Sequence, residues 1–399
     1  MTHQLPQGFQ SAGITCGIKE SGRPDLAAFV SEVPASMAGV FAQNRVLGAP
    51  VLLSRDRVTR PDGRAVIINS GNANACTGEQ GLTDAQRMTA ELAAQLNCDS
   101  EQVLVCSTGI IGVTLPMDLI SAGIPQVTAA LSDSPESLES AATAMMTTDT
   151  FAKFMATDIA LSSGPVRVTG AAKGAAMIAP NMATMLCVIM TDAALSPEQS
   201  ETYLRYGVDR TFNCISVDGH MSTSDSVILM ANGTSGTEPV SSEDNELIQD
   251  AVLQICRKLA TDIIRDAEGA SHFVTVDVKG FDTRDNAFRV AKEISESALV
   301  KTAICGNDPN WGRITSAAGY AGINFDVAHL SLTINSVEVY RAGTPVNYNE
   351  AALSQRMAEE DVHLLLELSG GPHSGKESVR FWTSDLTQEY VRLNSEYTT

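Results

Sequence analysis

The sequence predicts an α/β fold of the mixed α+β kind, in which layered sheets are covered by helices. Three observations predict it: short apolar runs recur along the chain, segments with helical spacing lie between them, and the two kinds do not alternate strictly. The chain has 399 residues, of which 44% are hydrophobic and 19% charged. This length exceeds what one hydrophobic core usually fills, so we expect two domains or lobes.

Apolar runs that suit strands occur in both halves of the chain. The run from Met185 to Met190 is continuously apolar, which is typical of a strand buried on both faces. The predicted strands are residues 65–68, 103–106, 155–161, 166–169, 185–191, 227–231, 273–278, 330–339 and 363–368.

Helical spacing is clearest in residues 242–265. Ser242 precedes two acidic residues in the first turn, an apolar stripe follows, and basic residues lie near the end. Residues 83–96 carry a similar stripe, with Asp84 near the expected start. The weaker helix predictions are residues 136–146, 197–206, 285–299, 311–318 and 349–359.

Charge and composition exclude several functional classes. The net charge of −20 argues against nucleic acid or an anionic membrane as a partner. The most apolar window, residues 175–195, is interrupted by Pro180, Asn181 and Asp192, so no membrane-spanning helix is expected. The N-terminal residues lack a signal-peptide pattern, and the eight cysteines are widely spaced without a C-x-x-C. We expect a cytoplasmic protein with free thiols.

Familiar catalytic motifs are missing from the sequence. The six histidines form no H-x-x-x-H pattern, so no metal site is predicted. There is no G-x-S-x-G elbow, Walker A loop or strand–GxGxxG–helix context. The candidates that remain are polar turns at strand ends, where sites are often built.

Thr184 is the most informative of these candidates. It follows Ala183 and precedes the apolar strand-like run. A threonine hydroxyl needs a neighbouring base, and cleavage of the preceding peptide bond makes the residue's own α-amino group that base. Such an amine titrates near ~7.7–8.0, so it accepts protons at neutral pH. The alternative, which local chemistry alone favours, is that Thr184 is merely the first residue of a buried strand.

Other turns offer hydroxyls and backbone donors. Thr108 and Gly109 follow a strand, and a Thr-Gly turn can aim a hydroxyl and an N–H at one point, as an oxyanion hole requires. The alternative is an ordinary β-turn. Asparagines in residues 69–78 hold backbone geometry in the preferred interpretation, or contact ligand. Thr147 and its neighbour offer two hydroxyls after a helix.

The second half of the chain holds three further candidates. Glu268 lies just beyond the long helix and either orients an amine or is a solvated carboxylate. In the turn-rich segment 306–313, Asp308 and Arg313 are expected as structural anchors. The tail, residues 394–399, would ordinarily be dismissed as frayed.

Taken together, these segments resemble the ornithine acetyltransferase family, the bifunctional arginine-biosynthesis proteins (glutamate N-acetyltransferases). The resemblance covers essentially the whole chain. Each motif is weak alone, but in this order, with Pro-Asn-Met-Ala-Thr at residues 180–184, they are highly specific. The matching segments are residues 8–9, 17–19, 69–74, 107–109, 147–150, 173–184, 218–219, 268–270, 306–313 and 394–399.

The resemblance implies self-cleavage between Ala183 and Thr184. The products are an α chain, residues 1–183, and a β chain, residues 184–399, which assemble as an α2β2 heterotetramer. Because the cut falls at the edge of a buried strand, we expect both pieces to stay interlocked. The implied catalytic groups are Thr184 as nucleophile, with Thr108 and Gly109 as oxyanion hole. The implied substrate contacts are Thr147, Lys173, Thr184, Glu268, Asn394 and Thr399.

The implied reaction moves an acetyl group from N-acetylornithine to glutamate and releases ornithine. It is a ping-pong cycle through an acetyl-threonyl ester, and it needs no cofactor and no metal. Lys173 suits a substrate carboxylate, and Glu268 suits a substrate ammonium. Whether acetyl-CoA is also a donor, as in bifunctional members, stays open.

Three positions depart from the family pattern. Glycine is common in the family where Ala176 and Ala267 stand, and an acidic residue is common at His220. The two alanines lie near the cleavage site and Glu268 respectively, so we expect them to alter processing rate or substrate preference, but they remove no catalytic group. The nearest alternative function is a self-processing N-terminal-nucleophile amidase or aminopeptidase, which passes the acyl group to water. An unprocessed binding or scaffold protein is the alternative from another class.

Overall fold

The computed structural model describes residues 4–179, 185–359 and 361–396. It divides the chain into two compact units, each with its own sheet. The first unit comprises the described parts of residues 1–213 and 221–263, and the second those of residues 214–220 and 264–397. The two lobes expected from chain length are therefore present, and the mixed α/β class with layered sheets is confirmed. Within the described chain, no helix combines the length and apolarity needed to cross a membrane.

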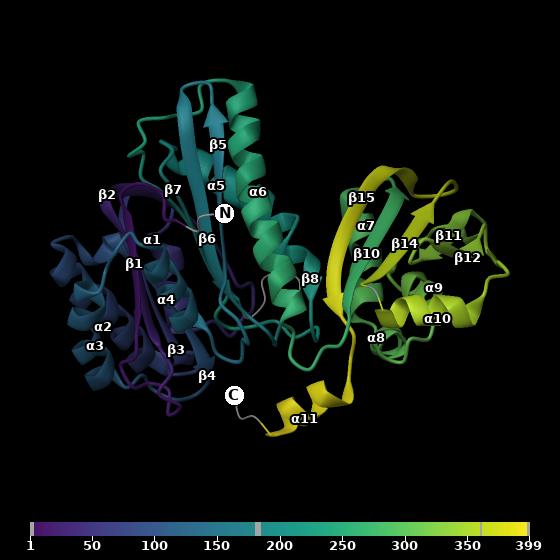
Figure 1. Cartoon of the computed structure of the whole chain (residues 1–399), viewed down its shortest axis with the longest axis horizontal. Helices are drawn as coiled ribbons and strands as arrows, with labels where there is room; N and C mark the ends of the chain where they lie inside the picture. Colours follow the sequence, from purple (N-terminus) through teal and green to yellow (C-terminus); the bar gives the residue numbers. More distant parts are fainter. Residues whose placement is uncertain (1–3, 180–184, 360, 397–399) are drawn as a thin grey trace. The chain divides into compact units, whose positions relative to one another are not determined.

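The first unit is built on an eight-stranded sheet (Figure 1). Its strand order is β4-β3-β2-β9-β7-β6-β5, and β1 pairs with β2 beside this path. Neighbours are antiparallel except for β3 with β4 and β7 with β9. The strands are β1 (Phe9–Ile14), β2 (Leu26–Phe41), β3 (Arg60–Asn72), β4 (Val103–Ile110), β5 (Lys153–Leu161), β6 (Gly164–Lys173), β7 (Leu186–Thr191) and β9 (Ser226–Ala231).

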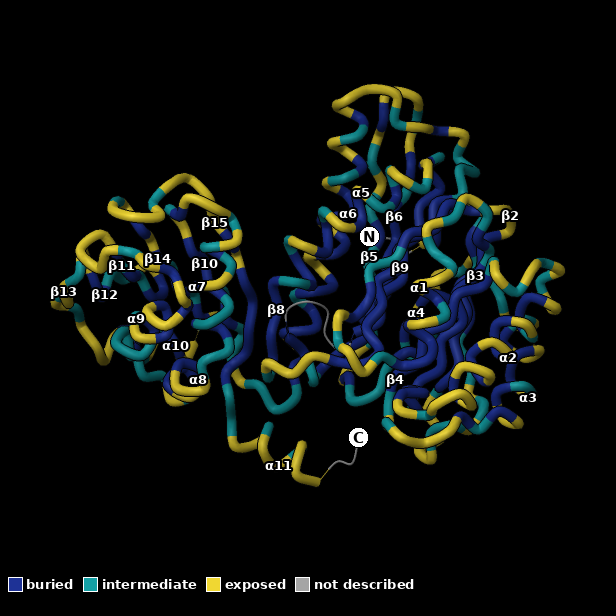
Figure 2. The backbone as a smooth tube through the Cα atoms, turned by 180° about the vertical axis from the view of Figure 1, so that it is seen from behind, coloured by how far each residue is buried: buried dark blue, intermediate teal, exposed yellow. Residues whose placement is uncertain are grey.

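Helices cover both faces of this sheet because its central strands are apolar on both sides. In β3, Val66 and Ile68 pack with α4 (Pro135–Met145) on one face. Ala65 and Ile67 pack with α2 (Gly78–Leu96) and α3 (Met117–Ala129) on the other. All six residues of β7 are buried, as the continuous apolar run predicts, and Figure 2 shows the sheet as the buried layer. The remaining helices of this unit are α1 (Ala49–Arg57), α5 (Pro197–Asp209) and, up to residue 263, α6 (Ser242–Arg265).

The second unit is a sheet covered by helices on one face. Its strand order is β13-β12-β11-β14-β10-β15-β8. One face packs against the helices, while the other carries Asp277, whose carboxylate binds Arg380 and His363 at 2.8 Å each. The strands are β8 (Ile215–Ser216), β10 (Phe273–Phe281), β11 (Leu330–Ile334), β12 (Val337–Arg341), β13 (Thr344–Pro345), β14 (Val362–Leu368) and β15 (Ser374–Ser384). The helices are α7 (Arg284–Glu296), α8 (Ala298–Cys305), α9 (Trp311–Gly319), α10 (Glu350–Glu359) and α11 (Gln388–Glu396).

Three predicted elements differ from the structure. The single strand expected over 330–339 is a hairpin, because Asn335 and Ser336 adopt left-handed backbone angles (φ 44° and 65°). The helix expected over 285–299 stops at Glu296, and Ser297 begins α8 by accepting a hydrogen bond from Val300 N. The helix expected over 83–96 begins at residue 78, so Asp84 lies buried inside it. The other predicted strands and helices are present within a few residues.

Candidate functional site

A buried cluster in the first unit joins three of the predicted site residues. Lys173 ends β6, Thr108 lies near the end of β4, and Thr147 follows α4. The Lys173 Nζ donates to Thr147 Oγ1 at 2.9 Å and to Thr108 Oγ1 at 3.3 Å. Lys173 is 2% exposed and Thr108 1%. The cluster therefore places an ammonium and two hydroxyls at one point, largely out of water.

Asp149 organises this cluster, although no sequence motif marks it as a functional residue. Its carboxylate accepts from Thr147 N at 3.0 Å, from Gly174 N at 2.6 Å and from Lys153 Nζ at 2.7 Å. Burial raises the pKa of Asp149, but the positive charges of Lys173 and Lys153 and the bond from Gly174 outweigh it and lower the pKa to about 2. Asp149 therefore stays ionised and fixes the backbone on both sides of the Lys173–Thr147 contact.

Gly109 lies at an irregular strand end, whereas the sequence predicted a turn after residue 106, either as an oxyanion hole or as an ordinary β-turn. Strand β4 continues to residue 110, and its pairing with β3 shifts register at Asn72. The φ of Gly109 is +133°, and a Cβ there would stand 2.3 Å from the carbonyl carbon of Gly71. Glycine is required at this position, because any side chain would push the two strand ends apart.

The asparagines of segment 69–78 hold backbone geometry, as preferred above. Asn69 Nδ2 donates to Asn72 O at 2.9 Å, and Asn74 Nδ2 donates to Gly81 O at 2.8 Å. Asn72 Nδ2 reaches Val113 O at 3.1 Å. The side-chain amides of these asparagines therefore hold the backbone around the loop that follows β3.

The predicted cleavage site, Ala183 and Thr184, lies outside the described residues. The next residue, Met185, is buried and directly precedes β7. Its backbone N donates to Asp225 Oδ1 at 3.1 Å. Asp225 is fully buried just before β9, and sequence reasoning missed it because no local pattern singles it out.

In the second unit, Glu268 and Asn394 are brought together. Asn394 Nδ2 donates to Glu268 Oε2 at 3.1 Å; Asn394 is exposed and Glu268 is half-buried. The tail is not frayed over its described part, because residues 388–396 form α11. The last candidate, Thr399, lies outside the described residues.

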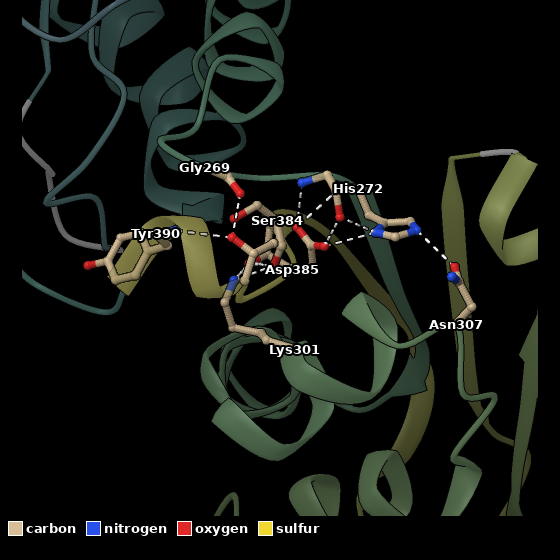
Figure 3. Close-up of polar contacts among 10 residues, drawn as sticks. Gly269, His272, Lys301, Asn307, Ser384, Asp385 and Tyr390 are labelled. Carbon is tan, nitrogen blue, oxygen red and sulfur yellow. Dashed lines mark hydrogen bonds and ion pairs between the residues drawn. The ribbon is translucent and has the colours of Figure 1, made fainter. Parts of the chain in front are cut away.

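A polar cluster anchors the segment between β15 and α11 (Figure 3). Asp385 Oδ2 lies 2.8 Å from His272 Nδ1, whose Nε2 lies 3.0 Å from Asn307 Oδ1. The Lys301 Nζ donates to Thr383 Oγ1 at 2.9 Å and to Ser384 O. Burial lowers the pKa of Lys301 to about 8, against the opposing effect of nearby carboxylates, Asp385 first. These contacts therefore hold the start of the segment that leads from β15 to Asn394.

The anchors expected in 306–313 have structural partners. Arg313 Nη1 donates to Leu299 O at 3.0 Å, and Asp308 Oδ2 accepts from Asn310 Nδ2 at 2.9 Å. All eight cysteines are free thiols, and the part of the chain described here contains no group of three or more potential metal-binding side chains.

Comparisons with known proteins show which family the chain belongs to. A model of the ArgJ family matches residues 10–399. The chain is 45% identical over 402 residues to the arginine biosynthesis bifunctional protein ArgJ of Rhodopirellula baltica, covering 100% of this chain and 97% of that protein. It is 44% identical over 407 residues to the protein of the same name from Synechococcus, with 99% and 96% covered.

Among solved structures, the chain is similar to an ornithine acetyltransferase complexed with ornithine from Mycobacterium tuberculosis. The identity is 42%, the match covers 45% of this chain and 94% of that one, and the TM-score is 0.43. The two curated ArgJ relatives, 45% and 44% identical over almost their whole lengths, show that the chain is an enzyme. The chain belongs to the ArgJ family, as the motif resemblance predicted.

Proposed function

We propose that this enzyme transfers an acetyl group from N2-acetyl-L-ornithine to L-glutamate. The products are L-ornithine and N-acetyl-L-glutamate, as in the cyclic route of arginine biosynthesis. Two of the relatives described above are named for arginine biosynthesis and one for ornithine acetyl transfer. The observation that carries the proposal is the buried contact of Lys173 with the hydroxyls of Thr108 and Thr147.

The working enzyme is formed when the chain cleaves itself between Ala183 and Thr184. The α chain is then residues 1–183 and the β chain residues 184–399, and two of each form a heterotetramer. Sheet order supports this arrangement: β7 and β9 come after residue 184 yet lie between β2 and β6, which come before it. A cut at this point leaves the two chains joined by strand pairing on both sides.

The Thr184 hydroxyl attacks the acetamide carbonyl, and the α-amino group of the same residue takes its proton. The oxyanion is stabilised by the Thr108 hydroxyl and the Gly109 N–H. Because the Lys173 ammonium donates to Thr108 Oγ1, the hydroxyl proton of Thr108 can be donated elsewhere, and the adjacent charge makes it a stronger donor. Ornithine leaves with the proton, and glutamate then attacks the acetyl-threonyl ester in the reverse sense.

The substrate contacts are divided by charge. Lys173 binds a substrate carboxylate, with Thr147 held beside it. Glu268 binds a substrate ammonium, with Asn394 orienting its carboxylate. Thr399 completes the contacts. No cofactor takes part, and we place the reaction in the cytoplasm on the ground of the eight free cysteines.

Denaturing mass spectrometry before and after brief exposure to N-acetylornithine tests this function. We expect two chains of residues 1–183 and 184–399, the second gaining one acetyl group. A single unmodified chain would contradict the proposal. Adding glutamate should then speed the release of ornithine. A rate indifferent to glutamate would indicate an amidase that uses water, and acetylation of glutamate by acetyl-CoA would identify a bifunctional enzyme.

A further inference from the structure

An open pocket in the first unit is lined by two cations that the proposed reaction does not use. Its volume is about 540 Å³, which is within the range of small-molecule sites. The cations are Lys19 and Arg23, from the loop that joins β1 to β2. Residues 146–150, which follow α4, also line the pocket and include the proposed substrate contact Thr147. The pocket therefore adjoins the buried cluster, because Thr147 Oγ1 accepts from Lys173 Nζ.

Lys19 is held in place by its backbone and by its ammonium group. Lys19 N donates to Asp25 Oδ2 at 3.0 Å, which fixes the loop. The Lys19 Nζ donates to Pro24 O at 2.6 Å and to Met146 O at 2.7 Å. The second of these carbonyls belongs to the peptide bond that leads to Thr147. These two oxygens are the acceptors of the ammonium within the described chain, so one of its three hydrogens is left for a ligand.

The stem of Lys19 also lies close to the proposed oxyanion hole. A Cβ added at Gly71 would stand 3.0 Å from Lys19 Cγ, and a Cβ added at Gly109 would stand 2.3 Å from the carbonyl carbon of Gly71. Lys19 therefore contacts Gly71, which in turn contacts Gly109. Lys19 is thus separated by one residue from Gly109 and, through Met146 O, by one peptide unit from Thr147. An amino acid bound at these two groups lies beside the pocket.

The two amino acids of the proposed reaction differ in the charge at the end of the side chain. Both carry an α-carboxylate, for which Lys173 is proposed, but ornithine ends in an ammonium and glutamate in a second carboxylate. Glu268 attracts the ammonium and repels the carboxylate, so glutamate needs a cation of its own. Lys153 is already bound to Asp149 at 2.7 Å. Around this part of the described chain, the two cations of the pocket remain for that role.

We propose that Lys19, with Arg23 beside it, binds the side-chain carboxylate of glutamate and so selects the acetyl acceptor. This inference rests on the proposed function and names the site that recognises its second substrate. The Lys19 ammonium donates a charged hydrogen bond, and the exposed guanidinium of Arg23 adds positive charge. The same cations repel the side-chain ammonium of ornithine, which favours its departure before glutamate binds. Neither residue forms or breaks a covalent bond.

The electrostatics of Lys19 support this role. Burial lowers the pKa of the Lys19 ammonium to about 8, and repulsion from Lys173 and Arg23 adds to the decrease. Attraction to Asp25 and Asp149 opposes it. Lys19 is therefore still mostly protonated at pH 7, although part of its hydration is lost. A carboxylate bound to this ammonium stabilises the charged form and raises its pKa again.

The first test compares Lys19→Met with Lys258→Met. Lys258 is a cation on α6 of the same unit, but it binds Asp262 and does not line the pocket. Acetyl transfer is measured with glutamate and with glutamine, which has the same shape without the charge. For Lys19→Met we expect the KM for glutamate to rise by about 10- to 100-fold, as for loss of a hydrogen bond to a charged group. The preference for glutamate over glutamine should fall by a similar factor.

The half-reaction without glutamate gives the matching readout. Exchange of labelled ornithine into N-acetylornithine should proceed in Lys19→Met at the rate of Lys258→Met. An unchanged preference for glutamate, or an equal loss in the exchange, would overturn the inference. A loss confined to acetyl-CoA as donor would also overturn it, because the pocket would then hold a coenzyme phosphate. A wild type that transfers no acetyl group to glutamate would instead contradict the proposed function.

Two further variants separate binding from folding, because Lys19 also holds two backbone carbonyls. Lys19→Arg keeps the charge and should retain most of the preference for glutamate. Arg23→Gln removes an exposed guanidinium that makes no hydrogen bond or ion pair with the described residues, so the fold should be unaffected. We expect it to raise the KM for glutamate by about 2- to 5-fold, the size of an exposed ion pair. If Lys19→Met does not fold, an unchanged KM in Arg23→Gln overturns the inference.

Discussion

Positive charge is in excess around the Lys173 cluster. Asp149 is flanked by two buried cations, Lys153 and Lys173, whose charges lower its pKa. The pKa of Lys19 is lowered to about 8, mainly by burial and in smaller part by repulsion from the nearby Lys173. The negative charges of Asp25 and Asp149 oppose this decrease in the pKa of Lys19. A substrate carboxylate would relieve the remaining imbalance, which is the physical reason to give Lys173 a binding role.

Replacing Lys173 by methionine tests that role. The substitution keeps the length of the side chain and removes its charge, so we expect mainly a higher KM for N-acetylornithine. A decrease confined to kcat would contradict carboxylate binding and favour an effect on the Thr108 donor. Steady-state kinetics on the cleaved enzyme, with thermal unfolding as the check of fold, separates the two.

The Asp149–Lys153 ion pair predicts a stability that depends on pH. Because the folded pKa of Asp149 is about 2 and its ordinary value is 3.8, folding favours the ionised form. This stabilisation is complete above pH 3.8 and is lost as the pH falls through about 2. Asp149→Asn leaves Lys153 buried without its partner, so we expect a loss of ~3–5 kcal/mol in the free energy of unfolding at pH 7. Urea unfolding should show the gap between variant and wild type narrowing below pH 3.8; a gap independent of pH would contradict it.

At the scale of elements, α11 depends on a close backbone approach at Gly269. Its φ is +65°, and a Cβ there would stand 2.4 Å from Tyr390 N. The Gly269 carbonyl also accepts from Thr387 Oγ1 at 2.5 Å, just before the helix. The helix that carries Asn394 is therefore positioned by a residue next to Glu268.

Gly269→Ala should displace α11 and weaken the Asn394–Glu268 contact. We expect a KM increase of ~10-fold or more, the size of about one lost hydrogen bond to a charged group. Gly236→Ala is the matched control, since Gly236 has a φ of +68° but open space around its Cβ position. Both variants share the cost of the left-handed backbone. If the two variants gave the same KM, the close approach of Gly269 to Tyr390 would not contribute to substrate binding.

The elements also show how far sequence reasoning reaches. Strands rich in branched apolar residues, such as β3 and β7, are predictable because their burial leaves a continuous apolar run. Strand β2 was missed, since many of its residues are alanine, serine or glycine and carry little β signal. The break between α7 and α8 was missed because only the cap at Ser297 marks it.

Site residues divide in the same way. Thr108, Thr147 and Lys173 stand in recognisable motifs, and their contact in the structure agrees with that grouping. Asp149 and Asp225 acquire their character from partners 25 and 40 residues away and from burial. The local sequence shows neither these distant partners nor the burial, so the roles of the two carboxylates become visible only in the folded structure.

For the whole molecule, the sheet order predicts that the two chains of the proposed cleavage do not separate. Strands β7 and β9 are inserted between β2 and β6, with hydrogen-bonded pairing on both sides. Gel filtration of the cleaved enzyme should give one peak containing both chains, and they should part only at denaturant concentrations that unfold the protein. Separation under native conditions would contradict this sheet order.

The same insertion bears on how the protein is made. A chain cut before β7 had paired would yield two fragments, each with unpaired edges along strands that are otherwise buried. Such fragments aggregate more readily than they find each other, because joining them is a bimolecular step. Synthesis as one polypeptide makes this assembly intramolecular. If cleavage also requires the folded geometry around Met185, then only chains that have finished folding are cleaved. Unfolded or misfolded chains would then stay inactive.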